Sequence, residues 1–327
     1  MFGLLSRYPR WGADAMKSKL TTVLCISLVP VLFGIAFPAE AAPKQSTGVT
    51  YNATQLKVPV PASANGINDA GQIVGQTGTS GNQYGFIYEL TPAPLVTLIR
   101  DGTTNTQAYG INNAGQVVGA TDKTDGSGTY GFLYNGGNFT DFSVGTTSSG
   151  GVVTYAFGIN SGGQIVGEGL AGNYYEGFLY QGGTVEVLKV PGATDTQAGG
   201  INSAGEIVGW WLNDTRTRYS GFIYNNGVYT VINFPGSTRT ILSGINDFGQ
   251  IVGYYLDTSS NAHYFIYENG NFNVITVLLG GQVVLQGQTN TGSVNGINKA
   301  GQIVGSVITS NCNGCAFVAD PVVKLKK

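Results

Sequence analysis

Apolar residues along this chain fall into short runs separated by polar, glycine-rich turns, and one such arrangement recurs six times. Its first copy, at 66–75, reads Gly-Ile-Asn-Asp-Ala-Gly-Gln-Ile-Val-Gly, and successive copies start 42 to 52 residues apart. A repeat of this length is typical of a four-stranded β unit rather than of a pair of helices. The six copies lie at 66–75, 110–119, 158–167, 200–209, 244–253 and 296–305.

Each copy predicts two β-strands joined by a tight turn. In the second copy the first strand ends at 107–112, Asn-x-x-Gly forms the turn, and Gln-Val-Val-Gly begins the second strand. Six asparagines are expected to cap these turns: Asn68, Asn112, Asn160, Asn202, Asn246 and Asn298. The alternative is repeated metal ligation by these asparagines together with Asp69 or Asp247, but the residue after each asparagine varies freely.

A third and a fourth strand follow each copy. The third is an apolar run whose successive positions indicate burial on both faces. The fourth comes after a tight turn such as 135–138 and alternates apolar and polar residues, as expected for an edge strand. The apolar runs lie at 85–88, 131–134, 177–180, 221–224, 264–267 and 316–318.

Six four-stranded meanders around one axis make a six-bladed β-propeller, and this all-β fold is the one that the sequence predicts. A β-solenoid or an open stack is the alternative, although either would show shorter repeats and capping units. The last copy has little chain after it to supply a fourth strand. We therefore expect residues 55–60, which precede the first copy, to pair with 316–318 and close the ring.

The N-terminal segment has the features of a secretory signal. Basic residues precede an apolar run at 20–37, and the small residues Ala39 and Ala41 suit signal peptidase. We expect residues 1–41 to be removed and Met16 to be the true start. An uncleaved membrane anchor is the alternative, because the apolar run is just long enough to span a bilayer.

Composition narrows the possible functions of the remaining chain. Residues 42–327 carry 12 Lys or Arg against 16 Asp or Glu, a formal charge of −4, which excludes a basic patch for nucleic acid. We expect these residues to form a single monomeric domain that is secreted or periplasmic, has no membrane span after signal cleavage, and needs no cofactor or metal. The chain ends without an apolar tail, which favours release over anchoring.

Three cysteines are present, and Cys25 leaves with the signal segment. Cys312 and Cys315 form a Cys-Asn-Gly-Cys sequence, which in an exported chain predicts a structural disulfide. A free, reactive pair and a metal site are the alternatives. A zinc site would need two further ligands, and the whole chain has one histidine.

The Gly-Ile-Asn-x-x-Gly-Gln-Ile-Val-Gly core and the aromatic strand after it resemble the bacterial extracellular HAF repeat family, which has a His-Ala-Phe tripeptide before the third strand. The resemblance covers essentially the whole mature chain. It departs at the tripeptide, because 263–265 reads His-Tyr-Phe and 315–317 reads Cys-Ala-Phe, while the other copies keep the phenylalanine after a glycine. The resemblance implies export and a repeat fold, but no reaction and no catalytic residue.

Residues that could support catalysis are few. His263 is the only histidine and occupies the repeat position where the family has its own, so packing or a loop hydrogen bond is the favoured interpretation. Six acids fall between predicted second and third strands, where a pair could serve a glycosidase: Asp122, Asp125, Glu168, Glu176, Asp214 and Asp257. Nothing in the sequence pairs two of them, and 122–128 matches a calcium loop poorly.

Aromatic residues give the clearest functional signal. In a meander, the connections between second and third strands share one face, and they vary among the copies while keeping aromatic residues. We expect a ligand-binding face there, with one member of each aromatic doublet exposed. The candidate ligand-binding residues are Tyr174, Tyr175, Trp210, Trp211, Tyr254, Tyr255 and His263. The function predicted is recognition of a glycan, a peptide or a surface protein, and an exported hydrolase or lyase acting on polysaccharide is the alternative.

Overall fold

The computed structural model describes residues 44–45, 48–89, 96–98, 103–286 and 292–322, which form strands, turns and loops. The expected signal segment, and with it the question of an uncleaved anchor, lies outside these residues. No helix within the described ranges is long and apolar enough to cross a membrane.

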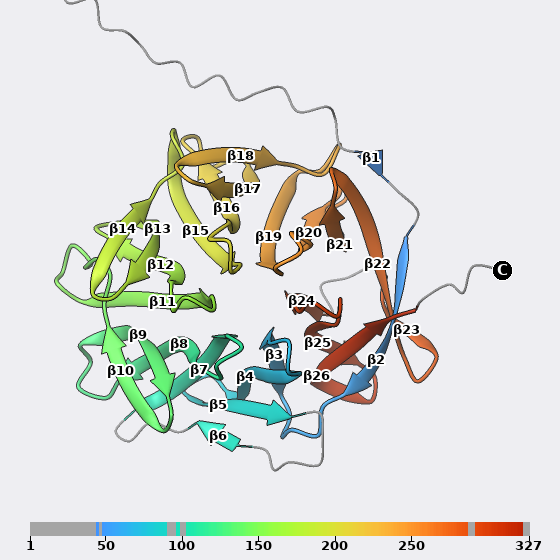
Figure 1. Ribbon diagram of the computed structural model, residues 1–327, viewed down its shortest axis with the longest axis horizontal. Helices are drawn as coiled ribbons and strands as arrows, with labels where there is room; N and C mark the ends of the chain where they lie inside the picture. Colours follow the sequence, from blue (N-terminus) through green and yellow to red (C-terminus); the bar gives the residue numbers. More distant parts are fainter. Residues whose placement is uncertain (1–43, 46–47, 90–95, 99–102, 287–291, 323–327) are drawn as a thin grey trace, which may run out of the picture. The chain divides into compact units, whose positions relative to one another are not determined.

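Most strands belong to six consecutive units, of which the first five have four strands in order and the sixth has three (Figure 1). Unit 1 contains β3 (Ala62–Ile67), β4 (Gln72–Thr79), β5 (Asn82–Glu89) and β6 (Val96–Leu98). Unit 2 contains β7 (Thr103–Ile111), β8 (Val117–Lys123), β9 (Gly128–Asn135) and β10 (Asn138–Phe142). Unit 3 contains β11 (Val152–Ile159), β12 (Ile165–Ala171), β13 (Tyr174–Gln181) and β14 (Thr184–Leu188).

The second half of the chain repeats this order. Unit 4 contains β15 (Ala193–Ile201), β16 (Ile207–Asn213), β17 (Tyr219–Asn225) and β18 (Val228–Ile232). Unit 5 contains β19 (Arg239–Ile245), β20 (Ile251–Leu256), β21 (Ala262–Glu268) and β22 (Asn271–Leu279), with β23 (Gln282–Leu285) added to β22. Unit 6 contains β24 (Gly292–Ile297), β25 (Ile303–Thr309) and β26 (Cys312–Pro321). The N-terminal part of the chain supplies β1 (Lys44–Gln45) and β2 (Val49–Gln55).

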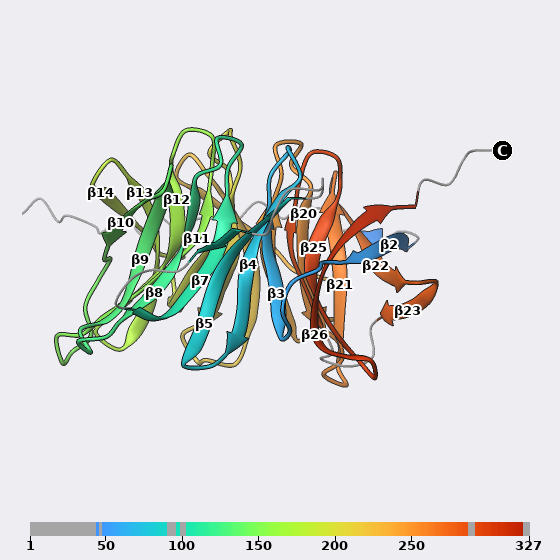
Figure 2. The ribbon, with the colours of Figure 1, turned by 90° about the horizontal axis from the view of Figure 1, so that it is seen from below.

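Within each unit, successive strands pair antiparallel. Short parallel pairings link unit 1 to unit 2, unit 2 to unit 3 and unit 4 to unit 5, and β2 lies between β22 of unit 5 and β26 of unit 6. The first strands of the units gather around a common centre and the fourth strands lie at the rim (Figure 1). Strands run between two opposite faces, where the hairpin turns lie (Figure 2). Hydrogen bonding joins units 1 to 3 into a 12-stranded sheet, and units 4 to 6 with β1 and β2 into a 14-stranded sheet.

An N-terminal strand pairs with the last unit, as predicted, but most of the pairing lies before the predicted residues. Residues 51–55 of β2 lie antiparallel to β26, with Gln55 opposite Phe317, and the pairing ends where Leu56 N donates to Ala316 O at 2.9 Å. The prediction of 55–60 therefore holds at residues 55 and 56 and is wrong for 57–60. Pro59 has no N–H to donate to a ladder, so the chain leaves the sheet here, and Leu56 and Val58 pack beside Ala316 and Val318 in the core.

The capping role predicted for the six asparagines is confirmed. Asn160 is an example, because its Oδ1 accepts hydrogen bonds from the backbone N–H groups of Gly162 and Gln164, both at 3.0 Å. Its Nδ2 donates to Gln164 Oε1 at 2.8 Å. The conserved pair of amides within each repeat therefore holds the turn, which explains why asparagine and glutamine (or glutamate in unit 4) recur four residues apart.

The same asparagines also connect the units, which the sequence did not reveal. Each Nδ2 donates to the backbone carbonyl of the equivalent asparagine in the next unit, and Asn298 donates to Asn68 O at 3.2 Å. The other acceptors are the carbonyls of Asn112, Asn160, Asn202, Asn246 and Asn298, at distances of 2.9–3.5 Å. These side chains are buried, and both hydrogen-bonding atoms of each amide have a partner in all six units.

Two glycines of each repeat permit close approach. In Gly167, the last residue of its copy, an added Cβ would lie 1.9 Å from Tyr155 O and 2.8 Å from the Phe178 ring. The first glycines pack on one another around the centre, where an added Cβ would lie 3.1–3.4 Å from the Cα of the next unit's glycine. In the core of each unit, the phenylalanine of the third strand therefore packs on a glycine of the second strand, which has no side chain in the way. These phenylalanines are fully buried: Phe86, Phe132, Phe178, Phe222, Phe265 and Phe317.

The apolar third strands are buried on both faces, as predicted, in units 5 and 6, where 264–267 and 316–318 are all buried. In β9, by contrast, Gly131 and Phe132 are buried, whereas Leu133 and Tyr134 are half-buried. The burial of these two residues is incomplete because the fourth strand beside them, β10, is largely exposed. Edge strands of this kind carry alternating residues, as the sequence indicated.

Candidate functional site

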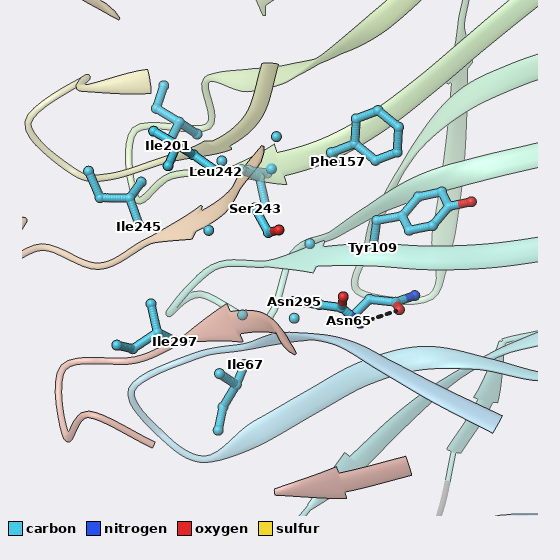
Figure 3. Close-up of a pocket in the computed structure, with 18 of the residues that line it drawn as sticks. Asn65, Ile67, Tyr109, Phe157, Ile201, Leu242, Ser243, Ile245, Asn295 and Ile297 are labelled. Carbon is cyan, nitrogen blue, oxygen red and sulfur yellow. Dashed lines mark hydrogen bonds between the residues drawn. The ribbon is translucent and has the colours of Figure 1, made fainter. Parts of the chain in front are cut away.

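The first strands of all six units surround a central cavity of about 290 Å³ (Figure 3). Each first strand reaches the cavity through a β-bulge, because its register with the second strand skips one residue directly before the Gly-Ile-Asn sequence. A bulge redirects the side chain of the extra residue. The skipped residues, called here the bulge residues, all line the cavity: Asn65, Tyr109, Phe157, Gly199, Ser243 and Asn295.

The bulge residues differ from unit to unit on a nearly constant frame. Tyr109 and Phe157 lie next to each other, with ring centroids 5.1 Å apart in an edge-to-face arrangement, and Asn65 lies beside Asn295 (Figure 3). Two aromatic rings, two amides and one hydroxyl therefore face the same space. Below them, the six isoleucines of the Gly-Ile-Asn sequences line both this cavity and a smaller one of about 70 Å³.

Side chains around the cavity are ordered by one another. Asn295 Nδ2 donates to Ala64 O at 2.9 Å and to Ser293 Oγ at 3.0 Å, and Asn65 Nδ2 donates to Ala108 O at 2.8 Å. The hydroxyl of Tyr109 donates to Gln107 Oε1. These contacts fix the orientation of the cavity wall before any ligand arrives, which lowers the entropic cost of binding.

A buried carboxyl group, that of Glu168, contacts one of the residues that line the cavity. Gln197 lines the cavity and accepts a hydrogen bond from Trp210 Nε1 at 2.6 Å. Its amide also bonds to Glu168, which is only 9% exposed. Burial raises the pKa of Glu168 from 4.5 to about 7, the hydrogen bond from Gln197 opposes this shift, and the nearby charge of Asp195 adds to it.

The opposite end of the centre is occupied by the residues that follow the six asparagines. Lys299 Nζ lies 2.8 Å from Asp247 Oδ2 and 3.5 Å from Asp69 Oδ2. Asp69 exchanges two hydrogen bonds with Asn113 at 2.7 and 2.9 Å. Asp247 accepts a backbone and a hydroxyl hydrogen bond from Ser203, which in turn contacts Ser161.

This network, called here the crown, consists of Asp69, Asn113, Ser161, Ser203, Asp247 and Lys299. Burial alone would raise the pKa of Asp247, but hydrogen bonds from Lys299 and Ser203 hold it below its usual range. The two carboxylates that the sequence offered as metal ligands thus have a lysine between them. No group of three or more His, Cys, Asp or Glu side chains suited to a metal ion occurs in the described part of the chain.

All seven aromatic and histidine candidates lie in paired strands and not in loops, because the hairpins of the second and third strands extend further than the sequence indicated. Alternation along β20 buries Tyr255, whose ring stacks on Phe234 at 3.6 Å and on His263 at 4.7 Å. Trp211 packs against the core cluster of unit 4, and its Nε1 is buried without a partner among the described residues.

The remaining candidates are more accessible but lie apart from one another. Tyr174 is 47% exposed, with the Arg216 guanidinium 5.3 Å from its ring. Tyr175 donates its backbone N–H to Asp195 at 3.0 Å. Trp210 packs against Tyr219, with ring centroids 5.3 Å apart. Tyr254 lines a groove between units 5 and 6, so the structure does not gather the predicted residues into one site.

The acids and His263 serve local structure. His263 Nε2 lies 3.0 Å from Asp257 Oδ2, and Asp257 also caps its own turn through the backbone N–H groups of Ser259 and Asn261. The hydrogen bonds from His263 and Asn261 hold the pKa of Asp257 below its usual range. Asp122 accepts hydrogen bonds from Asn105 and Thr129, both at 2.7 Å.

The predicted disulfide between Cys312 and Cys315 is confirmed, and it lies in the hairpin that joins β25 to β26. Gly314 between the cysteines has a φ of 86°, which a residue with a side chain rarely adopts. An added Cβ at this glycine would lie 3.2 Å from Pro61 Cβ, so the hairpin packs against the segment that leads into β3.

Sequence reasoning missed the bulge residues. The signal that could have found them is the position directly before each Gly-Ile-Asn, which reads Asn, Tyr, Phe, Gly, Ser and Asn in the six copies while its neighbours stay nearly constant. When one position varies among otherwise similar repeats, that position is a candidate for ligand recognition.

No protein-family model and no curated protein matches the sequence. Among solved structures, the chain is similar to TolB from Acinetobacter baumannii, with a TM-score of 0.50 and 12% identity over 76% of this chain and 63% of that one. A second TolB, from Agrobacterium tumefaciens, gives a TM-score of 0.53 and 10% identity over 69% of this chain and 81% of that one.

A third similar structure is the β-propeller domain of the Trilobed protease from Pyrococcus furiosus, with a TM-score of 0.48 and 11% identity over 80% of this chain and 79% of that one. The chain spans less than two thirds of the Acinetobacter TolB. At these identities the TolB structures indicate the fold alone, an all-β fold of the β-propeller kind.

Proposed function

We propose that this chain is a closed, six-bladed β-propeller that binds a carbohydrate at its central cavity. Three observations support closure. Strand β2 pairs with β26, and the hydrogen bonds between asparagines return from Asn298 to Asn68. The glycine contacts return in the same way, since an added Cβ on Gly296 would lie 3.3 Å from Gly66 Cα. Each four-stranded unit is then one blade.

The observation that carries the binding proposal is the set of bulge residues. Five side chains converge on one cavity from equivalent places, the sixth place being Gly199, and they combine flat aromatic surface with amide and hydroxyl groups. A sugar ring has apolar faces and a rim of hydroxyl groups, so it is complementary to rings such as Tyr109 and Phe157 beside Asn65, Ser243 and Asn295. A cavity of about 290 Å³ suits one terminal sugar.

The crown explains why the ligand enters from the other end. Its charged and polar side chains are hydrogen-bonded to one another, and its cavity is only about 70 Å³. A ligand that entered there would have to break these contacts without gaining better ones. At the other end of the cavity, hydrogen bonds hold the amides of Asn65 and Asn295 in place. The rings of Tyr109 and Phe157 are half-buried there.

The proposal also covers the compartment and the family. The disulfide between Cys312 and Cys315 supports an extracytoplasmic location. Together with the basic and apolar N-terminal segment, it supports a secreted or periplasmic protein. The six repeats support the HAF repeat type, and we propose that the protein acts as a monomer. None of the seven aromatic and histidine candidates is among the described residues that line the central cavity.

The described wall of the central cavity lacks the pair of carboxylates that most glycosidases use. Among the described residues that line the central cavity there is no carboxylate, histidine or thiol, and Tyr109 is the titratable side chain. Glu168 stands behind Gln197 and His263 pairs with Asp257 in the outer part of unit 5. The arrangement supports binding over the alternative of a hydrolase or lyase.

A glycan array probed with the mature protein tests the proposal. We expect binding to a restricted set of terminal sugars, and we expect Tyr109→Ala and Phe157→Ala to reduce that binding by about tenfold or more, because each removes a stacking surface. Ser243→Phe, which fills the cavity from a partly exposed position, should abolish it.

Phe248→Ala is the matched control, because Phe248 is 71% exposed on the Asn-x-x-Gly turn of unit 5, at the crown end. It should leave glycan binding and the melting temperature unchanged. Equal loss of binding in Phe248→Ala and Tyr109→Ala, or binding that survives Ser243→Phe in a folded protein, would contradict the central cavity as the site. Capture of peptides but not of glycans would contradict the ligand class.

A further inference from the structure

A groove of about 360 Å³ lies between units 5 and 6 and meets the central cavity at two shared residues, Ser243 and Asn295. We call it the 5–6 groove, and its side chains used below are Arg239, Ser243, Tyr254, Tyr264, Ser293 and Asn295. Arg239 and Ser243 lie four residues apart on β19, so the groove runs about 13 Å along this strand. It is longer than a single sugar ring.

Arg239 lies at the outer end of the 5–6 groove, where β19 begins. Its guanidinium lies over the ring of Tyr219, 3.9 Å from the ring centroid, and Tyr219 packs against Trp210. An arginine stacked on an aromatic ring keeps its in-plane N–H groups free for a carboxylate or phosphate. The stacking thus orients the cation without neutralising it.

The charge of Arg239 has no acidic partner in the described part of the chain. Four other basic side chains there, Lys123, Lys189, Arg216 and Lys299, form ion pairs with carboxylates. Asp257 follows Leu256, the residue in register with Arg239, but its carboxylate is bonded to Asn261 and His263. No carboxylate is among the groove-lining residues that the structure describes.

The rest of the 5–6 groove offers uncharged groups for a sugar. The rings of Tyr254 and Tyr264 lie 6.3 Å apart, and Tyr264 donates its hydroxyl to Gly292 O. Burial raises the pKa of Tyr264 to about 12, so this hydroxyl stays protonated and the groove gains no negative charge. Ser293 and Ser306 share a hydrogen bond of 3.0 Å, and Ser243 lies between groove and cavity.

We infer that the 5–6 groove is a subsite for a negatively charged sugar, so that the preferred ligand is an acidic oligosaccharide whose carboxylate pairs with Arg239. This inference rests on the proposed function, because it extends the ligand of the central cavity outward along β19. One sugar occupies the cavity, and the chain continues past Ser243 between Tyr254 and the β24 side of the groove. A charge-assisted pair at its end adds affinity and selects against neutral chains.

The test compares a short oligogalacturonate with the same oligosaccharide after methyl esterification, by calorimetric titration into the mature protein. We expect the acid to bind about tenfold more tightly than the ester. Arg239→Gln should bind both equally, at the affinity of the ester, and Arg239→Lys should restore part of the preference. Arg218→Gln is the control, because Arg218 is exposed in the turn between β16 and β17.

Each outcome has a definite meaning. Equal binding of acid and ester by the unaltered protein, with no effect of Arg239→Gln, would overturn the acidic subsite and leave carbohydrate binding intact. Absence of binding to both compounds and to every neutral and acidic sugar of an array would overturn the proposed function and the subsite together. Binding of a short glutamate peptide in place of the acid would overturn the carbohydrate class for both. Melting temperatures of the Arg239 variants show whether each is folded.

Discussion

Replacing Glu168 with Gln should stabilise the protein at neutral and alkaline pH. Glu168 is 9% exposed, and burial, the largest cause, raises its pKa from 4.5 to about 7. The folded state therefore retains a proton that the unfolded chain releases, and the free energy of unfolding falls as the pH rises from about 4.5 to about 7. Above about pH 7 the full stabilising contribution of the protonated carboxyl group has been lost, and below about pH 4.5 none of it has been lost.

The magnitude follows from the shift. A difference between 4.5 and about 7, at about 1.4 kcal/mol for each pKa unit, corresponds to about 3 kcal/mol of lost stability at alkaline pH. Gln has nearly the shape of the protonated acid, and its oxygen can still accept the hydrogen bond from the Gln197 amide. Glu168→Gln should thus recover up to about 3 kcal/mol at pH 8 and almost nothing at pH 4.5.

Urea unfolding of both proteins across this pH range measures the effect. Glu176→Gln is the control, since Glu176 forms a solvent-accessible ion pair with Lys189 at 2.9 Å. Its loss should cost less than about 1 kcal/mol. Equal unfolding midpoints for Glu168→Gln and the unaltered protein at pH 8, or destabilisation by Glu168→Gln at every pH, would refute the assignment of a buried carboxyl group that ionises at a cost.

Two further predictions concern the frame of the protein. Asn160→Ala removes the turn cap and the contact with Asn202 O, and it should lower the free energy of unfolding by about 3 kcal/mol, measured by urea unfolding. If the ring closes, Asn298→Ala should cost about as much, whereas a much smaller cost would indicate an open junction between units 6 and 1. Cys312→Ser with Cys315→Ser should cost about 2 kcal/mol or less, because the disulfide closes a loop of sequence separation 3. Mass spectrometry of the unaltered protein should find no free thiol at these positions, and two free thiols would contradict the disulfide.

The strands, their order and the asparagine turns could be predicted from the sequence because they are local. Asn160 and Gln164 are four residues apart and recur in every unit except unit 4, where Glu206 replaces the glutamine, so the pattern alone reveals their pairing. The phenylalanine after each copy likewise identified the third strand. The register of β2 on β26 was harder to predict from the sequence. It depends on where the chain leaves the sheet before Pro59, which has no N–H to donate.

The contacts between units could not be predicted, because they join residues that lie far apart in the sequence. Lys299 and Asp69 are separated by most of the chain, yet they share a hydrogen bond of 2.9 Å from Lys299 N. The bulge residues were missed for a related reason. A strand pattern read with a period of two gives no indication that one residue is skipped before each Gly-Ile-Asn, and the bulge is what turns Tyr109 or Ser243 toward the cavity.

The most direct test of the central claim is a crystal structure of the mature protein with a glycan selected on the array. The account predicts electron density for a terminal sugar in the central cavity, in contact with the Tyr109 and Phe157 rings and within hydrogen-bonding distance of Ser243 or Asn295. Density over Tyr174 at the outer part of unit 3, or at the crown beside Lys299, with an empty central cavity would contradict it.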